Sequence, residues 1–350
     1  MRIGINALSL EPGYCGETVY LRNIFARLRD LQPETKAIFI TSARNHEFFA
    51  GWDRVMLDAP ADCGPMGLPV SDREFAKALE SAGVDAVFSS IQRTPVKTRV
   101  PHVLYAMDLQ FVVEPLTKAR WRDKAVVKKI MQACENALAI VASSEFIRRQ
   151  LLELLDVPLN RVVVAPMGVS DIFAEPQDCW VEKPYILSVG ATRPSKNIDG
   201  LLKAFDFFET QNPHSLVIAG LPGECERPDW GPRVMRIQQC PEKALAGLYQ
   251  HCDAMVCPSF YDGSGITILE AMRAGAQIVA GRVGAIPEIG GNAPIYCNPE
   301  HPGVIASAIQ RAIEIEPEKR KRRALYMTNA AAEYTWEKCA WKTLQAFRLR

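Results

Sequence analysis

Residues 261–280 read YDGSGITILEAMRAGAQIVA. The stretch places one carboxylate, Asp262, in a glycine-rich turn and a second, Glu270, in a segment with helical periodicity, with seven residues between them. Short apolar runs at residues 254–257 and 277–280 flank the segment and are typical of buried strands. The order of strand, glycine turn, helix and strand predicts one repeating unit of a parallel α/β sheet.

The glycine-rich turn has the composition of a loop that binds a phosphorylated ligand. In a doubly wound sheet, ligands bind at the carboxyl ends of the strands, where the following helices present unpaired N–H groups and roughly half a positive charge. Gly263 and Gly265 allow the backbone to approach a ligand closely, while Asp262 and Glu270 can accept hydrogen bonds from hydroxyl groups. The pattern predicts a diphosphate between a sugar and a ribose. The alternative is an ordinary turn in which Asp262 bonds its own loop and Glu270 lies on the surface.

The same alternation of apolar runs and amphipathic segments extends along the chain and predicts two parallel sheets. A first series of strands is expected at residues 3–5, 37–41, 86–89, 102–106, 139–142 and 161–165, and a second at residues 185–189, 215–219, 234–237, 254–257, 277–280 and 294–297. Between the two series, residues 168–184 are polar and carry prolines, and we interpret them as an interdomain linker. We therefore expect an α/β fold with two Rossmann-like domains, at residues 1–172 and 173–334.

Residues 335–350 form a separate C-terminal segment. Thr335 can cap a helix in which four apolar residues lie on one face. These residues are Trp336, Cys339, Ala340 and Phe347. A helix with one apolar face must pack on a domain, and the pattern leaves open whether it packs on its own domain or crosses back to the first.

The composition is that of an ordinary globular protein. The chain has 350 residues, of which 48% are hydrophobic and 23% charged, so two domains of usual size are expected. A formal net charge of +1 argues against a nucleic-acid partner. The ten cysteines form no CxxC pair, which argues against a zinc ribbon, and scattered thiols suit a reducing compartment. The N-terminus lacks a secretory pattern and no apolar run reaches about 18 residues, so we predict a cytoplasmic protein without a membrane span.

The stretch at residues 261–280, followed by GAIPEIGG at residues 284–291, resembles the motif of retaining GT-B glycosyltransferases of the family-four type, also called glycosyl transferases group 1. In that family an acid and a glutamate are separated by seven residues within a pattern close to EGFGLPxLEAMAxGxPVVA. Other segments resemble further family motifs, in the expected order. They are CGETVYLRNI from Cys15, MDLQF from Met107, VASSEFIRRQL from Val141, VVAPMGVSDIF from Val163 and ILSVGATRPSKNIDGLLKAF from Ile186. The resemblance covers nearly the whole chain.

The resemblance implies a GT-B fold, in which two Rossmann-like domains face a central cleft, with the donor on the C-terminal domain and the acceptor on the N-terminal one. It implies a nucleoside-diphosphate sugar as donor, no cofactor and no metal. Glu270 would bind the ribose and Asp262 the transferred sugar. The further donor-site candidates in this loop are Gly263, Ser264, Gly265 and Ile266. Asp262 stands where glutamate is more common, and its side chain is about 1.5 Å shorter. A different sugar, a shifted loop and a tolerant position are the open explanations.

Three further residues complete the donor site that the resemblance implies. Lys196 stands where the family places a lysine on the diphosphate, and an ammonium fixed there would stabilise the charge that grows on the leaving nucleotide. The arginine that often accompanies it is replaced by Ser195 and Ala191, so Arg193 is the candidate for a second cation. Gly16 would approach the phosphate from the first domain. The alternative for Lys196 is a role limited to capping the next helix.

The clearest departure from the family is Met107, because relatives usually carry a histidine there and methionine cannot transfer a proton. In the interpretation that we favour, the leaving phosphate itself deprotonates the acceptor. In a second interpretation, Asp108 or His102 takes over, although His102 lies an odd number of residues earlier and is expected to face the other way. In a third, the protein binds its ligand without transferring the sugar.

The segment KARWRDKAVVKK, from Lys118 to Lys129, carries six basic residues against one aspartate. With Trp121 within it, the segment suits peripheral contact with an anionic membrane, at the inner face, where a lipid-linked acceptor would lie. A solvated basic helix face is the alternative, and it is the interpretation that we prefer.

Together these observations predict a retaining, metal-independent hexosyltransferase that moves a sugar from a GDP- or UDP-linked donor to a saccharide or lipid-linked acceptor in glycan or polysaccharide biosynthesis. The segments MDLQF and GATRPSKN resemble bacterial mannosyltransferases, which favours GDP-mannose as the donor. The candidate catalytic residues are Lys196, Asp262 and Asp108. A degenerate protein that only binds the sugar nucleotide is the main alternative, and a sugar-nucleotide epimerase on the same architecture is a weaker one.

Overall fold

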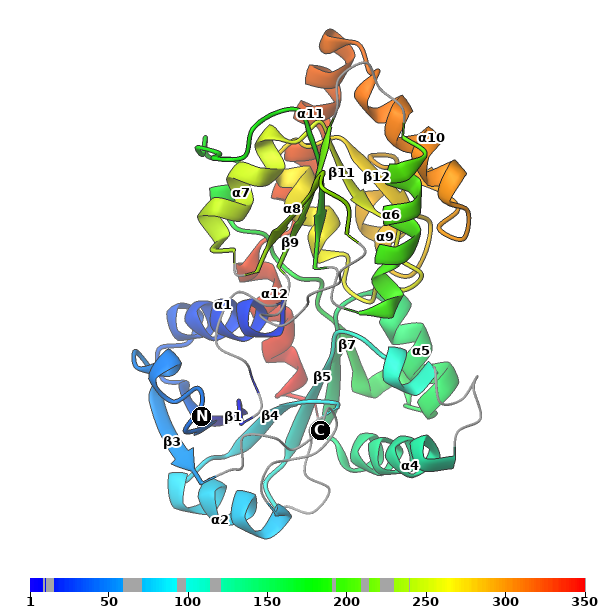
Figure 1. Cartoon of the computed structure of the whole chain (residues 1–350). Coiled ribbons are helices and arrows are strands. Elements are labelled where there is room, and N and C mark those ends of the chain that lie inside the picture. The colour runs from blue at the N-terminus through cyan, green and yellow to red at the C-terminus, as the bar shows by residue number, and fades with distance from the viewer. Residues whose placement is uncertain are drawn as a thin grey trace. The chain divides into compact units, whose positions relative to one another are not determined.

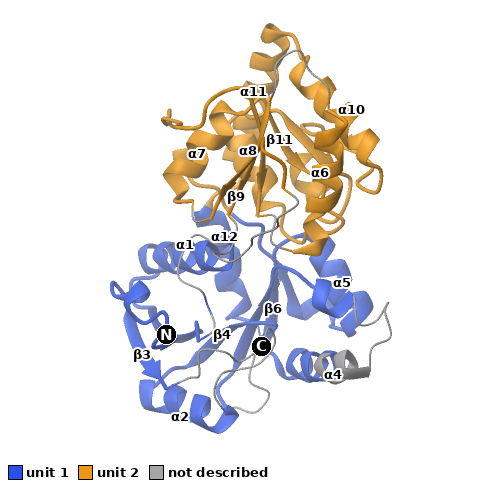
Figure 2. Cartoon of the chain, viewed as in Figure 1, with its two compact units in different colours: residues 1–167, 336–350 blue, residues 168–335 orange. Residues whose placement is uncertain are grey.

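The computed structural model describes residues 1–8, 10, 16–58, 71–92, 99–113, 121–190, 193–208, 214–220, 230–238 and 240–349, without the side chains of residues 121–126. The chain divides into two compact units (Figure 2). Unit 1 contains residues 1–167 and 336–350, and unit 2 contains residues 168–335. Each unit has its own parallel sheet and its own hydrophobic core.

The boundary between the units falls after Met167, whereas the sequence predicted it after residue 172 with a linker at residues 168–184. The predicted linker is instead part of unit 2. Phe173 within it is buried and packs edge-on against the ring of Tyr249, with 5.9 Å between the ring centroids. The prolines and polar residues of this segment therefore indicate that it lacks regular strands, although it packs against the rest of unit 2.

In unit 1 the described strands form a seven-stranded parallel sheet in the order β3-β2-β1-β4-β5-β6-β7 (Figure 1). The strands are β1 (Arg2–Asn6), β2 (Lys36–Ser42), β3 (Asp53–Leu57), β4 (Ala86–Ser90), β5 (His102–Ala106), β6 (Ala139–Ala142) and β7 (Val162–Val164). Consecutive side chains of a strand point to opposite faces. Ile38 and Ile40 therefore lie on one face of the sheet, and Phe39 lies on the other.

The helices of unit 1 cover both faces of its sheet. They are α1 (Gly16–Leu31), α2 (Asp72–Ala82), α4 (Trp121–Asn136), α5 (Glu145–Leu155) and α12 (Trp336–Ala346), with short 3-10 helices η1 (Glu47–Phe49) and η2 (Leu159–Arg161). Phe75 of α2 packs in the cluster of Ile38 and Ile40, while Phe25 of α1 packs against Phe39. The apolar faces of these helices follow the helical period, and burying them on the sheet holds the unit together.

In unit 2 the described strands form a six-stranded parallel sheet in the order β10-β9-β8-β11-β12-β13. The strands are β8 (Tyr185–Val189), β9 (Ser215–Ala219), β10 (Val234–Ile237), β11 (Ala254–Cys257), β12 (Ile278–Gly281) and β13 (Ile295–Cys297). The chain proceeds outward from β8 to one edge and then returns to β11 to build the other half. The strand order therefore reverses between β8 and β11, which is where ligands bind in doubly wound sheets.

The helices of unit 2 also lie on both faces of their sheet (Figure 1). They are α6 (Ile198–Asp206), α7 (Glu242–His251), α8 (Ile266–Arg273), α9 (Ile286–Gly290), α10 (Pro302–Ile313) and α11 (Pro317–Ala332), with η3 (Asp171–Phe173) and η4 (Pro194–Lys196). Leu201 of α6 and Ile309 of α10 share one core cluster with Ile186 of β8. The next side chain along, that of Tyr185, reaches α7, where its hydroxyl donates to the carbonyl of Leu248 at 2.8 Å.

All twelve predicted strands are present, within one or two residues of their expected ends. The prediction missed β3, whose residues Asp53–Leu57 are partly exposed. This strand lies at the edge of the sheet and pairs only with β2 among the described strands. It therefore lacks the continuous apolar run that marks a strand buried on both faces.

The C-terminal helix α12 belongs to unit 1, which settles the alternative that the sequence left open. It packs along α1 and on β6 and β7. Trp336, Cys339 and Ala340 are buried as expected, and Phe347 just after the helix packs on the ring of Phe88. The chain therefore passes twice between the units, after Met167 and after Thr335.

The described cysteines are free thiols, and all but Cys179 are buried. Burial raises the pKa of Cys134 to about 12 and that of Cys297 to about 11, so these thiols stay protonated and pack as small apolar groups. Among the described residues, no helix is both long enough and apolar enough to span a membrane.

Candidate functional site

The two loops that carry the predicted donor residues meet at the reversal point of the unit 2 sheet. Lys196 ends η4, which follows β8, and Asp262 lies in the loop between β11 and α8. The backbone N–H of Phe260 in the second loop donates to the carbonyl of Ser195 in the first at 2.7 Å. Residues that are far apart in the sequence are thus joined at the carboxyl edge of the sheet.

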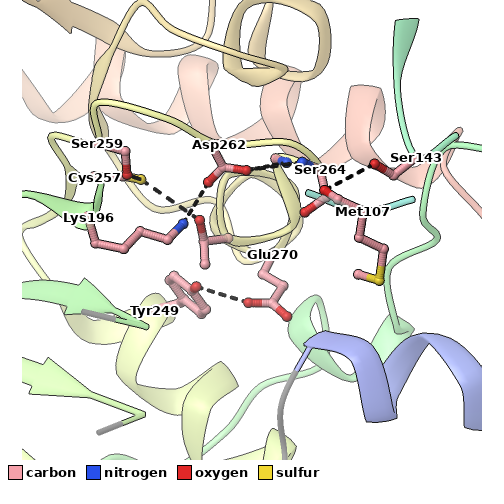
Figure 3. Close-up of polar contacts among 11 residues, drawn as sticks. Met107, Ser143, Lys196, Tyr249, Cys257, Ser259, Asp262, Ser264 and Glu270 are labelled. Carbon is pink, nitrogen blue, oxygen red and sulfur yellow. Dashed lines mark hydrogen bonds and ion pairs between the residues drawn. The ribbon is translucent and has the colours of Figure 1, made fainter. Parts of the chain in front are cut away.

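Lys196 and Asp262 form an ion pair, with 2.8 Å between Nζ and Oδ2 (Figure 3). The side chain of Asp262 is 4% exposed and that of Lys196 is 21% exposed. The other carboxylate oxygen, Oδ1, accepts hydrogen bonds from the backbone N–H groups of Gly265 at 2.7 Å and Ser264 at 3.2 Å. Asp262 thus orders the start of α8 and holds the ammonium of Lys196 at the same time.

The carboxyl of Asp262 stays ionised in this environment. Burial alone would raise its pKa, but the charge and hydrogen bond of Lys196, together with the amides of Gly265 and Ser264, outweigh burial and hold the pKa below its usual value. An ionised carboxylate is an acceptor and not a donor of hydrogen bonds. Asp262 can therefore accept hydrogen bonds from hydroxyl groups of a ligand while it stays paired with Lys196.

Asn197 ties three loops of the site together. Its backbone is left-handed, with φ of +55°, a conformation that asparagine tolerates better than most residues. Its side chain accepts from the backbone N–H of Gly200 at 3.2 Å, and thereby caps α6. It also donates to the carbonyls of Pro258 at 3.1 Å and Pro299 at 2.6 Å. Helix capping, the alternative considered for this sequence segment, is thus done by Asn197, while Lys196 reaches Asp262.

Two glycines with positive φ shape the loop of Asp262. Gly265, with φ of +68°, precedes α8, and a Cβ there would lie 2.8 Å from the side chain of Ile289. Gly284, with φ of +58°, lies under the loop, and a Cβ there would lie 2.0 Å from the carbonyl oxygen of Asp262. That carbonyl accepts from the backbone N–H of Ala285 at 2.8 Å. Glycine is therefore required at position 284 by both conformation and space.

Glu270 lies in α8, and its side chain is buried with the residue 4% exposed. Its Oε2 accepts a hydrogen bond from the hydroxyl of Tyr249 at 3.0 Å (Figure 3). The alternative in which Glu270 is a surface residue is therefore wrong. Tyr249 was not among the predicted site residues, because no motif marks a tyrosine in α7 whose partner is in α8.

The remaining unit 2 candidates lie around the same edge. Gly263 is buried, Ser264 and Ile266 are half-buried, and Ile266 begins α8. Arg193 is exposed at the start of η4, three residues before Lys196. Ala191 lies outside the described residues.

The donor-site candidate Gly16 lies beside Met107 within unit 1. Gly16 is the first residue of α1, and Met107 follows β5. A Cβ on Gly16 would lie 3.9 Å from Cε of Met107, which is ordinary contact, so the methionine fills the space beside the N-terminus of α1.

Asp108 has a local structural partner. Its Oδ1 accepts from the backbone N–H of Gln110 at 2.7 Å, where a helical turn begins. This arrangement is an Asx turn, which aspartate forms readily. The catalytic role assigned to Asp108 stays a prediction.

His102 does not lie where it could take over the function of a histidine at position 107. It begins β5, whereas Met107 follows the other end of that strand. The side chain of His102 is buried, and burial lowers its pKa to about 4 in spite of opposing effects from the backbone of Val100 and the carboxylate of Asp72. His102 is thus a neutral core residue of unit 1.

The depressed pKa of His102 predicts a specific loss of stability in mild acid. The unfolded chain takes up a proton near pH 6.5 and the folded chain only near pH 4, so stability is fully present above pH 6.5 and is lost as the pH falls towards 4. Between pH 7 and pH 5 the free energy of unfolding should fall by about 2 kcal/mol from this group. Urea unfolding at both pH values gives the free energy of unfolding of the wild type and of His102→Gln. The contribution of His102 is the difference between the two proteins in how far this free energy falls from pH 7 to pH 5. An equal pH dependence in both proteins would contradict the prediction, and His301→Gln, at an exposed position, is the control.

The described residues test two further predictions only in part, namely membrane contact through the basic segment and a reaction without a metal. Of the basic segment from Lys118 to Lys129, residues 118–120 and the side chains of residues 121–126 lie outside the described part of the structure. Within the described residues there is no group of three or more His, Cys, Asp or Glu side chains that could hold a metal ion. Membrane contact and metal independence both stay predictions.

Comparison with known proteins links most of unit 2 to a family of glycosyltransferases. Residues 173–330 match the family model described as glycosyl transferases group 1. The O-antigen chain mannosyltransferase B of Escherichia coli is 26% identical over 264 residues, which cover 69% of this chain and 68% of the relative. The serotype-specific mannosyltransferase WbdA of Escherichia coli is 25% identical over 61% of this chain, but the match covers only 29% of that longer protein.

Solved structures agree in fold over nearly the whole chain. A sucrose-phosphate synthase from Thermosynechococcus elongatus superposes with a TM-score of 0.80 at 17% identity, covering 99% of this chain and 98% of that one. The Anabaena protein HepE, solved in complex with UDP and glucose, superposes with a TM-score of 0.77 at 15% identity and covers 99% of both chains. These findings confirm the fold and family that the sequence motifs predict. Residues 173–330 thus match the glycosyl transferases group 1 family, and the two Rossmann-like units of the chain have the GT-B fold.

Proposed function

We propose that this glycosyltransferase moves a hexosyl group, with retention of configuration, from a nucleoside-diphosphate sugar to a saccharide or a lipid-linked acceptor. The observation that carries the proposal is the Lys196–Asp262 ion pair at the reversal point of the unit 2 sheet. It supplies a cation for a diphosphate and a carboxylate for a sugar. Glu270, on the helix that follows, supplies a second carboxylate for the ribose.

The chemistry follows from the charge that develops during transfer. The bond between the anomeric carbon and the phosphate oxygen breaks, and the acceptor hydroxyl oxygen bonds to that carbon on the same face. The hydroxyl proton passes to the leaving phosphate, so the step needs no protein base at position 107. Lys196 has three N–H donors, so it can keep its bond to Asp262 while it stabilises the growing negative charge of the nucleotide.

The donor that we propose is GDP-mannose, and the pathway is polysaccharide biosynthesis. The names of the two Escherichia coli relatives, both mannosyltransferases, support this choice, although HepE was solved with UDP and glucose. A reaction without metal or cofactor is part of the proposal, as is a cytoplasmic location.

A second candidate is a protein that binds the sugar nucleotide without transferring the sugar. Met107 at the position of the usual histidine favours it, and so does the engagement of the neighbouring Asp108 in an Asx turn. The two candidates differ in turnover and not in binding.

A ligand screen combined with one variant tests the proposed function. GDP and GDP-mannose at about 100 times their Kd should stabilise the native state by about 2.7 kcal/mol, and so raise the melting temperature by several degrees, while UDP, ADP and dTDP give smaller shifts. Glu270→Ala should weaken GDP binding about tenfold, because the hydrogen bonds to the ribose are lost. Titration calorimetry measures the affinity, and slow release of GDP from GDP-mannose measures turnover.

The outcomes separate the candidates. GDP release with GDP-mannose supports the transferase, and tight binding without release, with or without an acceptor extract, supports the binding protein. Absence of a shift with all four nucleotides and their sugars would contradict both. Unchanged GDP affinity in Glu270→Ala would remove the ribose role of Glu270.

A further inference from the structure

The carboxylate of Glu270 is held by a buried hydroxyl on a neighbouring helix. The hydroxyl of Tyr249 in α7 donates to Oε2 of Glu270 in α8 at 3.0 Å. Tyr249 is fully buried and Glu270 is 4% exposed, so the bond lies in a protected environment where it is stronger than in water.

The ring of Tyr249 is itself fixed. Phe173 of η3 packs edge-on against it, with an interplanar angle of 67°. The segment that carries Phe173 is the one that the sequence predicted to be an interdomain linker, and η3 within it contacts α7. A series of contacts thus runs from Phe173, near the start of unit 2, through the ring and hydroxyl of Tyr249 to the carboxylate of Glu270.

A glutamate side chain has several rotatable bonds, and ordering it on ligand binding costs affinity. The bond from Tyr249 orders one oxygen of Glu270 before any ligand arrives. We propose that Tyr249 is a positioning residue that presents the Glu270 carboxylate to the ribose hydroxyls of the nucleotide, so that the preference for a ribonucleotide depends on both residues. This inference rests on the proposed role of Glu270.

The test compares a ribonucleotide with its deoxygenated analogue. The probes are GDP and 2′,3′-dideoxy-GDP, or UDP and its dideoxy analogue if UDP binds better in the screen. Wild-type protein should bind the ribonucleotide more tightly than the analogue. Tyr249→Phe removes only the hydroxyl and should weaken the ribonucleotide about tenfold, while the affinity for the dideoxy analogue stays the same within about twofold.

Tyr185→Phe is the matched control. Tyr185 is also fully buried in unit 2, and its hydroxyl donates to the carbonyl of Leu248 at 2.8 Å. Loss of this hydroxyl should lower the melting temperature by a similar amount without changing the preference for the ribonucleotide. The comparison separates positioning of Glu270 from general loosening of α7.

The outcomes are distinct. A selective loss of ribonucleotide affinity in Tyr249→Phe supports the inference. Equal losses for both probes, or the same selective loss in Tyr185→Phe, would assign Tyr249 a structural role only and overturn it. Unchanged affinity for both probes would also overturn it. If wild-type protein does not distinguish the two probes, the ribose role of Glu270 fails and the inference with it, while binding of the diphosphate in the same titration would show that the phosphate site stands.

Discussion

Replacing Lys196 with methionine is expected to lower the turnover of the sugar nucleotide about 10²- to 10³-fold. Methionine keeps an unbranched stem but removes the ammonium that lies 2.8 Å from Asp262. A preorganised charge aimed at a leaving group stabilises the transition state more than the bound substrate, so the loss should appear in kcat. Release of nucleoside diphosphate from the donor, followed by chromatography, measures it.

The same substitution also leaves the buried carboxylate of Asp262 without its cation, which is expected to cost about 3 kcal/mol of stability. A double variant, Lys196→Met with Asp262→Asn, removes the unpaired charge and should regain most of that stability without regaining turnover. Lys203→Met changes an exposed lysine of α6 and serves as the control for charge alone. Near-normal turnover in a folded Lys196→Met protein would show that the phosphate site lies elsewhere.

Most of the fold could be predicted because parallel strands buried on both faces leave a strong pattern. The runs at residues 102–106 and 185–189 coincide with β5 and β8 as observed. The pattern fails where burial is partial, as in β3 at the sheet edge. It also fails at the unit boundary, because residues 168–184 have the composition of a linker but are anchored through Phe173. Composition reports the lack of regular structure and not the lack of tertiary contacts.

The site could be predicted only as far as local motifs reach. Lys196, Asp262 and Glu270 stand in motifs, and the structure brings the first two into contact. Tyr249 could not be predicted, since its partner lies 21 residues away on another helix. The three hydrogen bonds of the Asn197 side chain could not be predicted either, because two of them go to carbonyls of distant loops. Residues that support a site through tertiary contacts leave no periodic signal in the sequence.

Replacing Gly284 with alanine is expected to displace the loop that carries Asp262. The new Cβ would lie 2.0 Å from the carbonyl oxygen of Asp262 and 3.0 Å from its backbone nitrogen, so the loop must move. The φ of +58° adds about 1–2 kcal/mol of strain for a residue with a side chain. Together these effects should cost about 3 kcal/mol or more of stability. A displacement of Asp262 by about 1 Å should also lower turnover about 100-fold.

Gly303→Ala provides the matched control, because a Cβ at Gly303 meets nothing within 4 Å and the residue lies in α10 with an ordinary φ. It should leave turnover unchanged and raise stability by up to about 1 kcal/mol, since alanine favours a helix over glycine. Urea unfolding and the release of nucleoside diphosphate measure both quantities in the two variants. A Gly284→Ala protein with wild-type turnover would show that the loop of Asp262 relaxes without moving its carboxylate, because the collision is with the backbone of Asp262 and the chemistry depends on its side chain. The position of Asp262 would then be set by Lys196 and the backbone amides of Ser264 and Gly265.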